Sequence, residues 1–473
     1  MLLPCLVSLI YRDREGLMFL IVAGCAFSAG FLLSFKKPEN TFFSLREGCM
    51  VTALSWILLS VVGAVPFVLT GEIPNFVDAL FETASGFTTT GASILNDVEA
   101  LSHTALFWRS FTHWIGGMGV LVFLLAVIPL SGGGSINLMR AESPGPSVGK
   151  LLPKIRESAR LLYIIYIVLS VLEFLFLIFG KMPLFDSITI TFGTAGTGGF
   201  GVLNSSCASY TPYQQWVITI FMLLFGVNFN AYFFIAYRRL KLLVTMEELR
   251  WYLVIIISSA TAITVTLINH AVNATDAVRQ AFFQVASIIT TTGFSTADFN
   301  SWVPIAQVIL VLLMFVGACA GSTGGGIKIS RILLLLKSIK KELLSFIHPK
   351  SVRKVMLDGK VVEHEVIRST NVFFSTYVMI FVISLILISI EGTDIVTGFT
   401  SVVASLSNIG PGLAKVGPMG NFSFYSPFSK IVLVFDMIAG RLELFPMLIL
   451  LAPHTWKESL QARKHRIESR IRE

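Results

Sequence analysis

The chain has 473 residues, of which 54% are hydrophobic and 14% are charged, and its formal net charge is +8. Soluble domains carry about 25% charged residues, so this composition excludes an ordinary soluble globular protein. The five cysteines have neither the spacing of a disulfide framework nor that of a metal site, and we expect them to pack in apolar surroundings. They are Cys5, Cys25, Cys49, Cys207 and Cys319.

Nine apolar segments are long enough to cross a hydrocarbon layer of about 30 Å, which takes about 20 residues. In chain order they are Leu17–Phe35, Gly48–Leu69, Leu106–Leu130, Leu161–Phe179, Trp216–Tyr237, Trp251–Ile268, Trp302–Leu336, Val372–Ile390 and Phe428–Leu451. A shorter piece, Leu2–Ile10, ends at charged residues and is interpreted as the end of a span whose start is missing. A signal peptide is the alternative, but the piece lacks a charged leading region and a cleavage site.

Lysine and arginine concentrate in alternate loops. Segments 36–47, 131–160, 238–250, 337–369 and 453–473 contain three, five, four, eight and six of them. Segments 71–104, 181–211, 271–301 and 391–426 contain zero, one, one and one. This positive-inside pattern predicts that the basic loops and the C-terminus are cytoplasmic. The net charge therefore indicates topology, and no nucleic-acid partner is expected.

Each outward segment contains a half-length apolar stretch followed by a turn rich in glycine and threonine. Aligning the turns on Gly91, Gly198, Gly293 and Gly410 gives steps of 107, 95 and 117 residues, and Gly199 fits the second turn equally well. The basic unit is therefore a repeat of span, re-entrant segment and span. We expect N-terminal extra helices in 1–47 and four pore repeats in 48–158, 159–250, 251–369 and 370–473, the last with a basic cytoplasmic tail.

Irregular backbone at membrane depth leaves peptide groups unpaired, so such a turn must line water or be buried in protein. Four turns from the same side of the membrane imply a shared axis, around which carbonyl oxygens can replace the hydration shell of a cation. Glycine permits the close backbone approach that this needs. An acidic residue lies near the start of each half-length stretch, which indicates a helix N-terminus because carboxylates stabilise that end of a helix. These residues are Asp78, Asp186, Asp276 and Asp394. Ordinary exposed loops are the alternative, but they would not recur at matching positions.

Seven short motifs carry a resemblance over nearly the whole chain. They are SLREG at 44–48, TTTGAS at 88–93, WIGGMG at 114–119, RAESPGP at 140–146, GSTGGGIK at 321–328, SNIGPG at 407–412 and GRLE at 440–443. Together they resemble the Trk/Ktr family of bacterial potassium transporters, in its TrkH-type membrane subunits. The resemblance implies an all-α integral membrane fold, with four pore repeats around one pore, in the bacterial cytoplasmic (inner) membrane. It also implies a homodimer, control by a cytosolic TrkA-like nucleotide-binding ring, potassium as the substrate, and no cofactor bound by the chain.

The resemblance further implies that each repeat holds potassium with the aligned glycine and the two residues before it. These are Thr89, Thr90 and Gly91; Gly196, Thr197 and Gly198, or Thr197, Gly198 and Gly199 in the shifted register; Thr291, Thr292 and Gly293; and Asn408, Ile409 and Gly410. No repeat has the TVGYG string of dedicated potassium channels, so we expect weaker discrimination against sodium.

The stretch 321–326 contains four glycines inside the long apolar segment Trp302–Leu336. Because each glycine destabilises a helix by about 1 kcal/mol relative to alanine, the helix should break there. We expect a gate formed by Gly321, Gly324, Gly325 and Gly326 together with Lys328; a structural kink is the alternative. A phosphate-binding loop is disfavoured because the lysine stands one place too late and no strand precedes the motif.

Arg441 lies deep in the last apolar segment, where an ionisable side chain usually faces a cavity or a partner. We expect it to face the water path below the filter and to belong to the gate; an ion pair with Asp436 is the alternative. Glu443 is only two residues on and is a poor partner.

His113 and His270 have no second ligand at metal spacing and are interpreted as ordinary histidines. We find no paired carboxylates, nucleophile elbow or dinucleotide fingerprint, so no enzyme is expected. The sequence therefore predicts potassium uptake through a gated pore. A sodium-coupled symporter is the alternative within transport, although such carriers usually have inverted repeats. A membrane ATPase is the alternative from another class.

Overall fold

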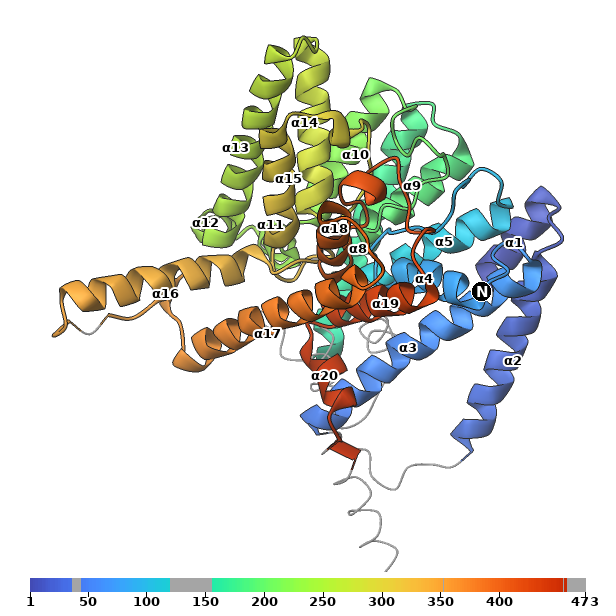
Figure 1. Ribbon diagram of the computed structural model, residues 1–473, viewed down its shortest axis with the longest axis horizontal. Coiled ribbons are helices and arrows are strands. Elements are labelled where there is room, and N and C mark those ends of the chain that lie inside the picture. The colour runs from blue at the N-terminus through green and yellow to red at the C-terminus, as the bar shows by residue number, and fades with distance from the viewer. Residues whose placement is uncertain (36–43, 120–154, 352, 454, 457–473) are drawn as a thin grey trace, which may run out of the picture.

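The computed structural model describes residues 1–35, 44–119, 155–351, 353–453 and 455–456, and helices dominate these residues (Figure 1). The N-terminal helices are α1 (Leu2–Tyr11) and α2 (Gly16–Ser34). The first repeat contains α3 (Leu45–Thr70), α4 (Phe76–Phe87) and α5 (His103–Gly117). The second contains α8 (Ile155–Phe179), α9 (Leu184–Gly196), α10 (Pro212–Phe225), α11 (Phe229–Ala236) and α12 (Leu240–Thr245).

The third repeat contains α13 (Glu247–Asn269), α14 (Ala274–Ile289), the 3-10 helix η1 (Phe299–Ser301), α15 (Pro304–Val316) and α16 (Ile329–Ile347). A hairpin of β1 (Met356–Leu357) and β2 (Lys360–Val361) follows, with Met356 opposite Val361. The fourth repeat contains α17 (His364–Ser389), α18 (Ile395–Leu406), η2 (Ala414–Val416), α19 (Pro427–Arg441) and α20 (Phe445–Leu451). The predicted all-α membrane fold is confirmed.

Five described helices are long and apolar enough to cross a membrane, namely α2, α3, α8, α13 and α17. The pair α10 and α11 passes the same test only when the two helices are taken together, and they meet at an angle of 90°. Of the nine predicted spans, Trp216–Tyr237, Trp302–Leu336 and Phe428–Leu451 are each divided between two helices in the structure. Only the break in Trp302–Leu336 was expected from the sequence. The predicted span Leu106–Leu130 begins in α5, and its part beyond residue 119 lies outside the described residues.

Local chemistry explains the breaks. A Cβ on Gly226 would lie 2.5 Å from the Tyr252 hydroxyl, so glycine is required where α10 ends. Asn228 then starts α11 by accepting a hydrogen bond from the Asn230 N–H at 2.9 Å. In the last repeat, Glu443 and Leu444 have left-handed backbone angles, with φ of 55° and 70°, and separate α19 from α20.

The repeats pack against one another in cyclic order. Helix α5 of the first repeat packs on α9 of the second, and α10 of the second packs on α14 of the third. Helix α15 packs on α18, and α19 of the fourth repeat returns to α4 of the first. Segments from opposite ends of the chain, blue and red in Figure 1, therefore lie side by side. This closure brings the four half-length helices to one centre.

Helix α16 projects from the bundle as a long arm, and α17 returns beside it (Figure 1). The arm is tied to the start of α13 by an ion pair between Lys337 and Glu247. Lys337 also donates to the Met356 carbonyl at 2.7 Å, and the Glu247 N–H donates to Asp358 at 2.7 Å. The arm, the hairpin and the start of α13 thus form one polar junction.

Candidate functional site

The predicted re-entrant segments are the helices α4, α9, α14 and α18, which have 12, 13, 16 and 12 residues. Asp78, Asp186 and Asp276 lie in the first turns of α4, α9 and α14. Asp394 is the N-cap of α18 and accepts a hydrogen bond from the Thr397 N–H at 2.9 Å. Hydrogen bonds from Thr397 lower the pKa of Asp394. The expected acidic starts of all four half-helices are confirmed.

The four half-helices end in the same way. In each, the N–H of the residue before the positive-φ glycine of the turn donates to the carbonyl five residues back. The pairs are Thr90 to Ser85 at 2.9 Å, and Gly198 to Gly193, Thr292 to Ser287 and Ile409 to Ala404, each at 2.8 Å. The preceding residue is left-handed each time, with φ of 56° at Thr89, 52° at Thr197, 59° at Thr291 and 56° at Asn408. This is a Schellman cap, in which glycine is the usual left-handed residue.

Left-handed threonine is unusual, because the conformation costs an L-residue roughly 1–2 kcal/mol. Such strain persists only where the surroundings enforce it, and it clusters at functional sites. The same strained cap at three threonines and one asparagine therefore supports a shared function for the four turns.

The backbone also decides the register of the second repeat. Gly199 has φ of 80°, matching 79° at Gly91, 84° at Gly293 and 95° at Gly410. The shifted register is therefore the structural equivalence, and the alignment on Gly198 is corrected. Gly196 is the last residue of α9 and stands one place before the left-handed residue.

The four turns form a closed ring. A Cβ on Gly91 would lie 2.0 Å from the carbonyl oxygen of Gly198, and one on Gly199 would lie 2.0 Å from that of Thr292. A Cβ on Gly293 would lie 2.2 Å from the carbonyl oxygen of Ile409, and one on Gly410 would lie 2.7 Å from that of Thr90. Each repeat thus places a glycine directly against a carbonyl of the next repeat, and the fourth returns to the first. All four glycines line one cavity of about 220 Å³.

Buried threonine hydroxyl groups in and beside the turns form hydrogen bonds with one another. Thr88 and Thr90 share a hydrogen bond of 2.8 Å, and Thr290 and Thr292 share one of the same length. Asn408 donates to the Thr90 hydroxyl at 3.0 Å and joins the fourth repeat to the first. The hydroxyls of Thr90 and Thr292 are thus engaged in holding the turns, whereas the Thr89 hydroxyl is buried without a hydrogen-bond partner among the described residues. The main-chain carbonyl is the one oxygen group that every repeat supplies.

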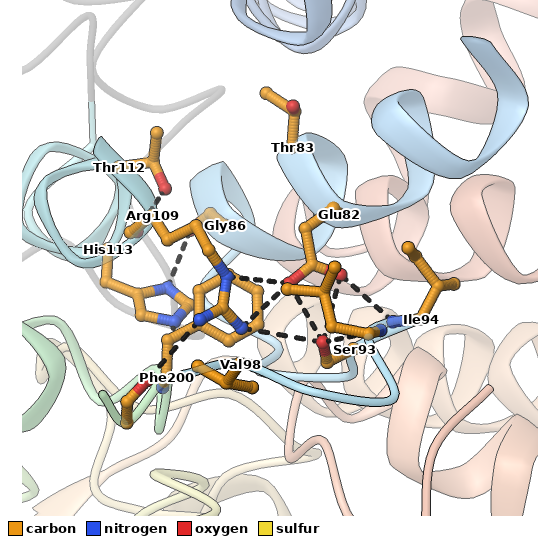
Figure 2. Close-up of polar contacts among 12 residues, drawn as sticks. Glu82, Thr83, Gly86, Ser93, Ile94, Val98, Arg109, Thr112, His113 and Phe200 are labelled. Atoms are coloured by element: carbon orange, nitrogen blue, oxygen red, sulfur yellow. Dashed lines mark hydrogen bonds and ion pairs between the residues drawn. The ribbon is translucent and has the colours of Figure 1, made fainter. Parts of the chain in front are cut away.

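A charged network stands behind the turns of the first two repeats (Figure 2). Arg109 on α5 donates to Glu82 on α4 at 2.8 Å, and both side chains are buried. Glu82 also accepts hydrogen bonds from the Ser93 hydroxyl at 2.9 Å and the Ile94 N–H at 3.0 Å, just after the first turn. This pair was not predicted from the sequence, although ionisable residues inside apolar segments are a recognisable signal.

The predicted helix break lies between α15 and α16, over residues 317–328, and its glycines come close to the turns. The Gly325 N–H donates to the Thr291 hydroxyl at 2.6 Å, and the Gly326 N–H donates to the Ser407 carbonyl at 3.0 Å. Lys328 is buried and its ammonium donates to the Gly324 carbonyl. The expected break is confirmed, and its glycine-rich part touches the third and fourth repeats at their turns.

Glu248, at the start of α13, holds the far side of this stretch. Its carboxylate accepts hydrogen bonds from the Ala320 N–H at 2.7 Å and the Ser330 N–H at 3.2 Å. It also accepts one from the Asn228 side chain at 3.4 Å. The neighbouring Glu247 is the residue that pairs with the arm. Glu248 was not predicted as a site residue, because an acidic residue at a helix start is common for electrostatic reasons alone.

Arg441 lies at the end of α19 and bridges two repeats. Its guanidinium donates to the Thr323 carbonyl at 2.8 Å, and to the carbonyls of Gly116 and Gly117 at the end of α5. The proposed alternative partner, Asp436, accepts a hydrogen bond from Ser384 at 2.7 Å. Glu443 pairs with Arg331 on α16. Arg441 therefore contacts the glycine-rich stretch directly.

Two segments named in the sequence analysis lie outside the described residues, namely the RAESPGP motif at 140–146 and the basic tail from residue 457 onward. The predicted ion-binding and gate residues all lie within the described part. The turns come together in one ring, and two of the predicted gate residues, Gly325 and Gly326, donate hydrogen bonds to it at Thr291 and Ser407.

Comparison with known proteins gives a consistent result. The family model of TrkH, described as a cation transport protein, matches residues 17–458. The Trk system potassium uptake protein TrkH of Salmonella typhimurium is 39% identical over 97% of this chain and 96% of the relative. The Trk system potassium uptake protein TrkG of Escherichia coli is 33% identical over 97% of this chain and 95% of the relative. These relatives are named as transport proteins rather than enzymes.

The fold agrees with a solved structure, the crystal structure of the potassium transporter TrkH from Vibrio parahaemolyticus. The TM-score is 0.85 at 31% sequence identity, covering 96% of this chain and 95% of that one. The family match, the relatives and the shared fold cover nearly the whole chain. The chain therefore belongs to the TrkH family of cation transport proteins.

Proposed function

We propose that the chain takes up potassium across the bacterial cytoplasmic membrane, through a filter formed by the four turns. The observation that carries the proposal is the closed ring, in which each glycine lies against a carbonyl of the next repeat. The names of the relatives support potassium as the cation. Main-chain oxygens around a shared axis are the groups that replace the water of a dehydrated monovalent cation.

The ion-binding residues of the proposal are those of the shifted register. They are Thr89, Thr90, Gly91, Thr197, Gly198, Gly199, Thr291, Thr292, Gly293, Asn408, Ile409 and Gly410. Their half-helices lead into the ring with their C-terminal ends, each equivalent to roughly half a negative charge. The negative ends would stabilise a cation at the centre without a charged side chain.

The gate of the proposal is the stretch 317–328, with Arg441. Hydrogen bonds from this stretch to Thr291 and Ser407 support a closed position directly against the filter. Arg441 adds a positive charge beside the stretch. At 4 Å, two unit charges repel by about 1 kcal/mol in water and by more where the dielectric constant is lower. Moving the stretch and Arg441 aside would open the path.

Control of the gate comes, in this proposal, from a cytosolic TrkA-like nucleotide-binding ring, and the chain assembles as a homodimer. The relatives are named as components of Trk systems, which supports a partner. The arm α16 exposes apolar residues and follows the glycine-rich stretch, which supports it as a contact surface. These residues include Leu336, Ile339, Leu343 and Phe346. The basic segments support a cytoplasmic position for this side and for the C-terminus.

Flux into liposomes that contain the purified chain tests the function. Potassium and sodium gradients are imposed separately, in the presence and absence of the partner ring. We expect downhill potassium flux that needs no sodium. Potassium movement that requires a sodium gradient would instead establish symport, and flux driven by nucleotide hydrolysis of the chain alone would establish an ATPase. Absence of potassium flux under every condition would contradict the proposal.

A further inference from the structure

The turn of the second repeat is held by helix α5 of the first repeat. Two side chains one helical turn apart, Arg109 and His113, face residues 198–201 (Figure 2). Residues four apart lie on the same helix face, so one rigid face of α5 supports the whole segment. Neither residue has a role in the proposed filter or gate.

His113 occupies the space beside Gly198. A Cβ on Gly198 would lie 2.3 Å from ring atoms of His113, so the imidazole fills the place that a side chain would need. Its Nε2 accepts a hydrogen bond from the Phe200 N–H at 3.2 Å. Its Nδ1 lies 2.8 Å from the Gly86 carbonyl oxygen, and it donates there because Nε2 is the acceptor. The imidazole thus links the half-helix of the first repeat to the turn of the second.

Arg109 contacts the same segment at Phe200 and Gly201. Its guanidinium lies over the Phe200 ring, 4.1 Å from the centroid, and donates to the Gly201 carbonyl at 3.3 Å. Buried Glu82 fixes the guanidinium from the other side. Phe200 is therefore restrained through both its ring and its N–H, immediately after Gly199.

The other repeats lack a charged group at this place. Counting back from the filter glycines, the positions that correspond to Glu82 are Ile190, Gln284 and Ser401. Gln284 donates to the Ala297 carbonyl at 3.4 Å, and Ser401 accepts from the Tyr425 hydroxyl at 2.8 Å. The ion pair that fixes Arg109 thus has no counterpart at the matching positions of the other three repeats, and the turn that Arg109 contacts has two adjacent glycines and correspondingly high conformational freedom.

We propose that His113 is a positioning residue that fixes the Gly198 carbonyl and thereby helps to set the preference for potassium over sodium. The inference rests on the proposed filter function. Sodium is the smaller ion, so it needs oxygens that approach more closely than potassium does. A turn of adjacent glycines that is free to move inward would coordinate sodium better. The imidazole, wedged beside Gly198 and bonded to Phe200, prevents that movement.

The experiment measures the potassium-to-sodium permeability ratio of liposome-reconstituted protein, a quantity that does not depend on how much protein is active. His113→Gln places an acceptor near the position of Nε2 and retains the Phe200 bond. His113→Asn retains only the donor to Gly86. We expect the ratio to fall about tenfold in His113→Asn, the change that 1.4 kcal/mol produces, and to stay near wild type in His113→Gln. His270→Gln, an exposed histidine at the end of α13, is the control.

Gly199→Ala in the same assay separates this inference from the proposed function. If Gly199→Ala changes the ratio and both His113 variants keep the wild-type value, the positioning role is wrong and the filter stands. If His113→Gln loses the preference as fully as His113→Asn, the Phe200 bond is not the cause and the inference also fails. If Gly199→Ala itself has no effect in folded protein, the proposed filter is refuted.

Discussion

Replacement of Gly199 by alanine tests the ring most directly. The added Cβ would lie 2.0 Å from the Thr292 carbonyl oxygen, whereas real Cβ atoms stay at least 3.0 Å from such neighbours. The carbonyl, or the turn that carries Gly199, must therefore retreat by at least 1.0 Å. Binding sites tolerate errors of only about 0.5 Å. The left-handed angle of 80° adds roughly 1–2 kcal/mol of strain for a residue with a side chain.

We expect Gly199→Ala to reduce potassium uptake about 5- to 30-fold, the factor that 1–2 kcal/mol produces, and to lower the preference over sodium. Gly410→Ala, with a nearest approach of 2.7 Å, should have the mildest steric effect of the four filter glycines. Gly201→Ala is the matched control, because Gly201 lines the same cavity while its Cβ would meet no atom within 3.5 Å.

The assay is rubidium and sodium flux into liposomes, normalised to folded protein. Normal flux and normal ion preference in Gly199→Ala, at wild-type abundance, would refute the ring geometry. A loss of flux in Gly201→Ala as large as that in Gly199→Ala would do the same, because it would show that any change in the cavity blocks transport.

Three further predictions concern the gate. Arg441→Ala should raise flux through the closed state, since it removes both a charge and the bond to Thr323; unchanged or reduced leak in abundant protein would argue against the gate role. Glu248→Ala should also raise leak, because the Ala320 N–H loses its acceptor, whereas Glu248→Gln keeps an acceptor oxygen; equal leak in the two variants would exclude this explanation. Shortening 321–326 by a few residues should give flux that no longer responds to partner or nucleotide, measured in the same liposomes. Full nucleotide control in a stable shortened protein would show that the gate lies elsewhere.

The half-helices and their turns could be predicted from sequence because they repeat. The correct register of the second repeat could not, since Gly198 and Gly199 are the same residue type. What separates them is the left-handed angle at Thr197, and threonine gives no sign in the sequence that it adopts that angle. The two registers can therefore be distinguished only by the backbone angles of the caps and not by residue type.

Helix breaks were predicted only where glycines cluster. The break before α11 lies at a single glycine, Gly226, and the need for glycine there arises from Tyr252 on a different helix. The break before α20 involves Glu443 and Leu444, neither of which favours a turn. Hydropathy cannot detect such breaks, because the residues on both sides remain apolar.

The partners of the buried charged side chains could not be predicted from the sequence either. Arg109 and Glu82 are 27 positions apart, and Arg441 bonds to carbonyls that any residue could supply. His113 was interpreted as an ordinary histidine. The positioning role proposed for His113 depends on Gly198, which lies beside it in space but 85 positions away in the chain.

The proposed filter presents the cation with peptide oxygens from Thr90, Gly198, Thr292 and Ile409. These four residues are two threonines, a glycine and an isoleucine, yet each supplies the same carbonyl group. A substitution at Ile409 can therefore act only through the volume or rigidity of its side chain, since the liganding atom cannot be mutated away. Four covalently joined quarters also make it possible to perturb one ligand at a time, which a homotetrameric ring of identical subunits does not allow. The chain can thus be used to measure how much a single carbonyl contributes to the choice between two alkali metal ions.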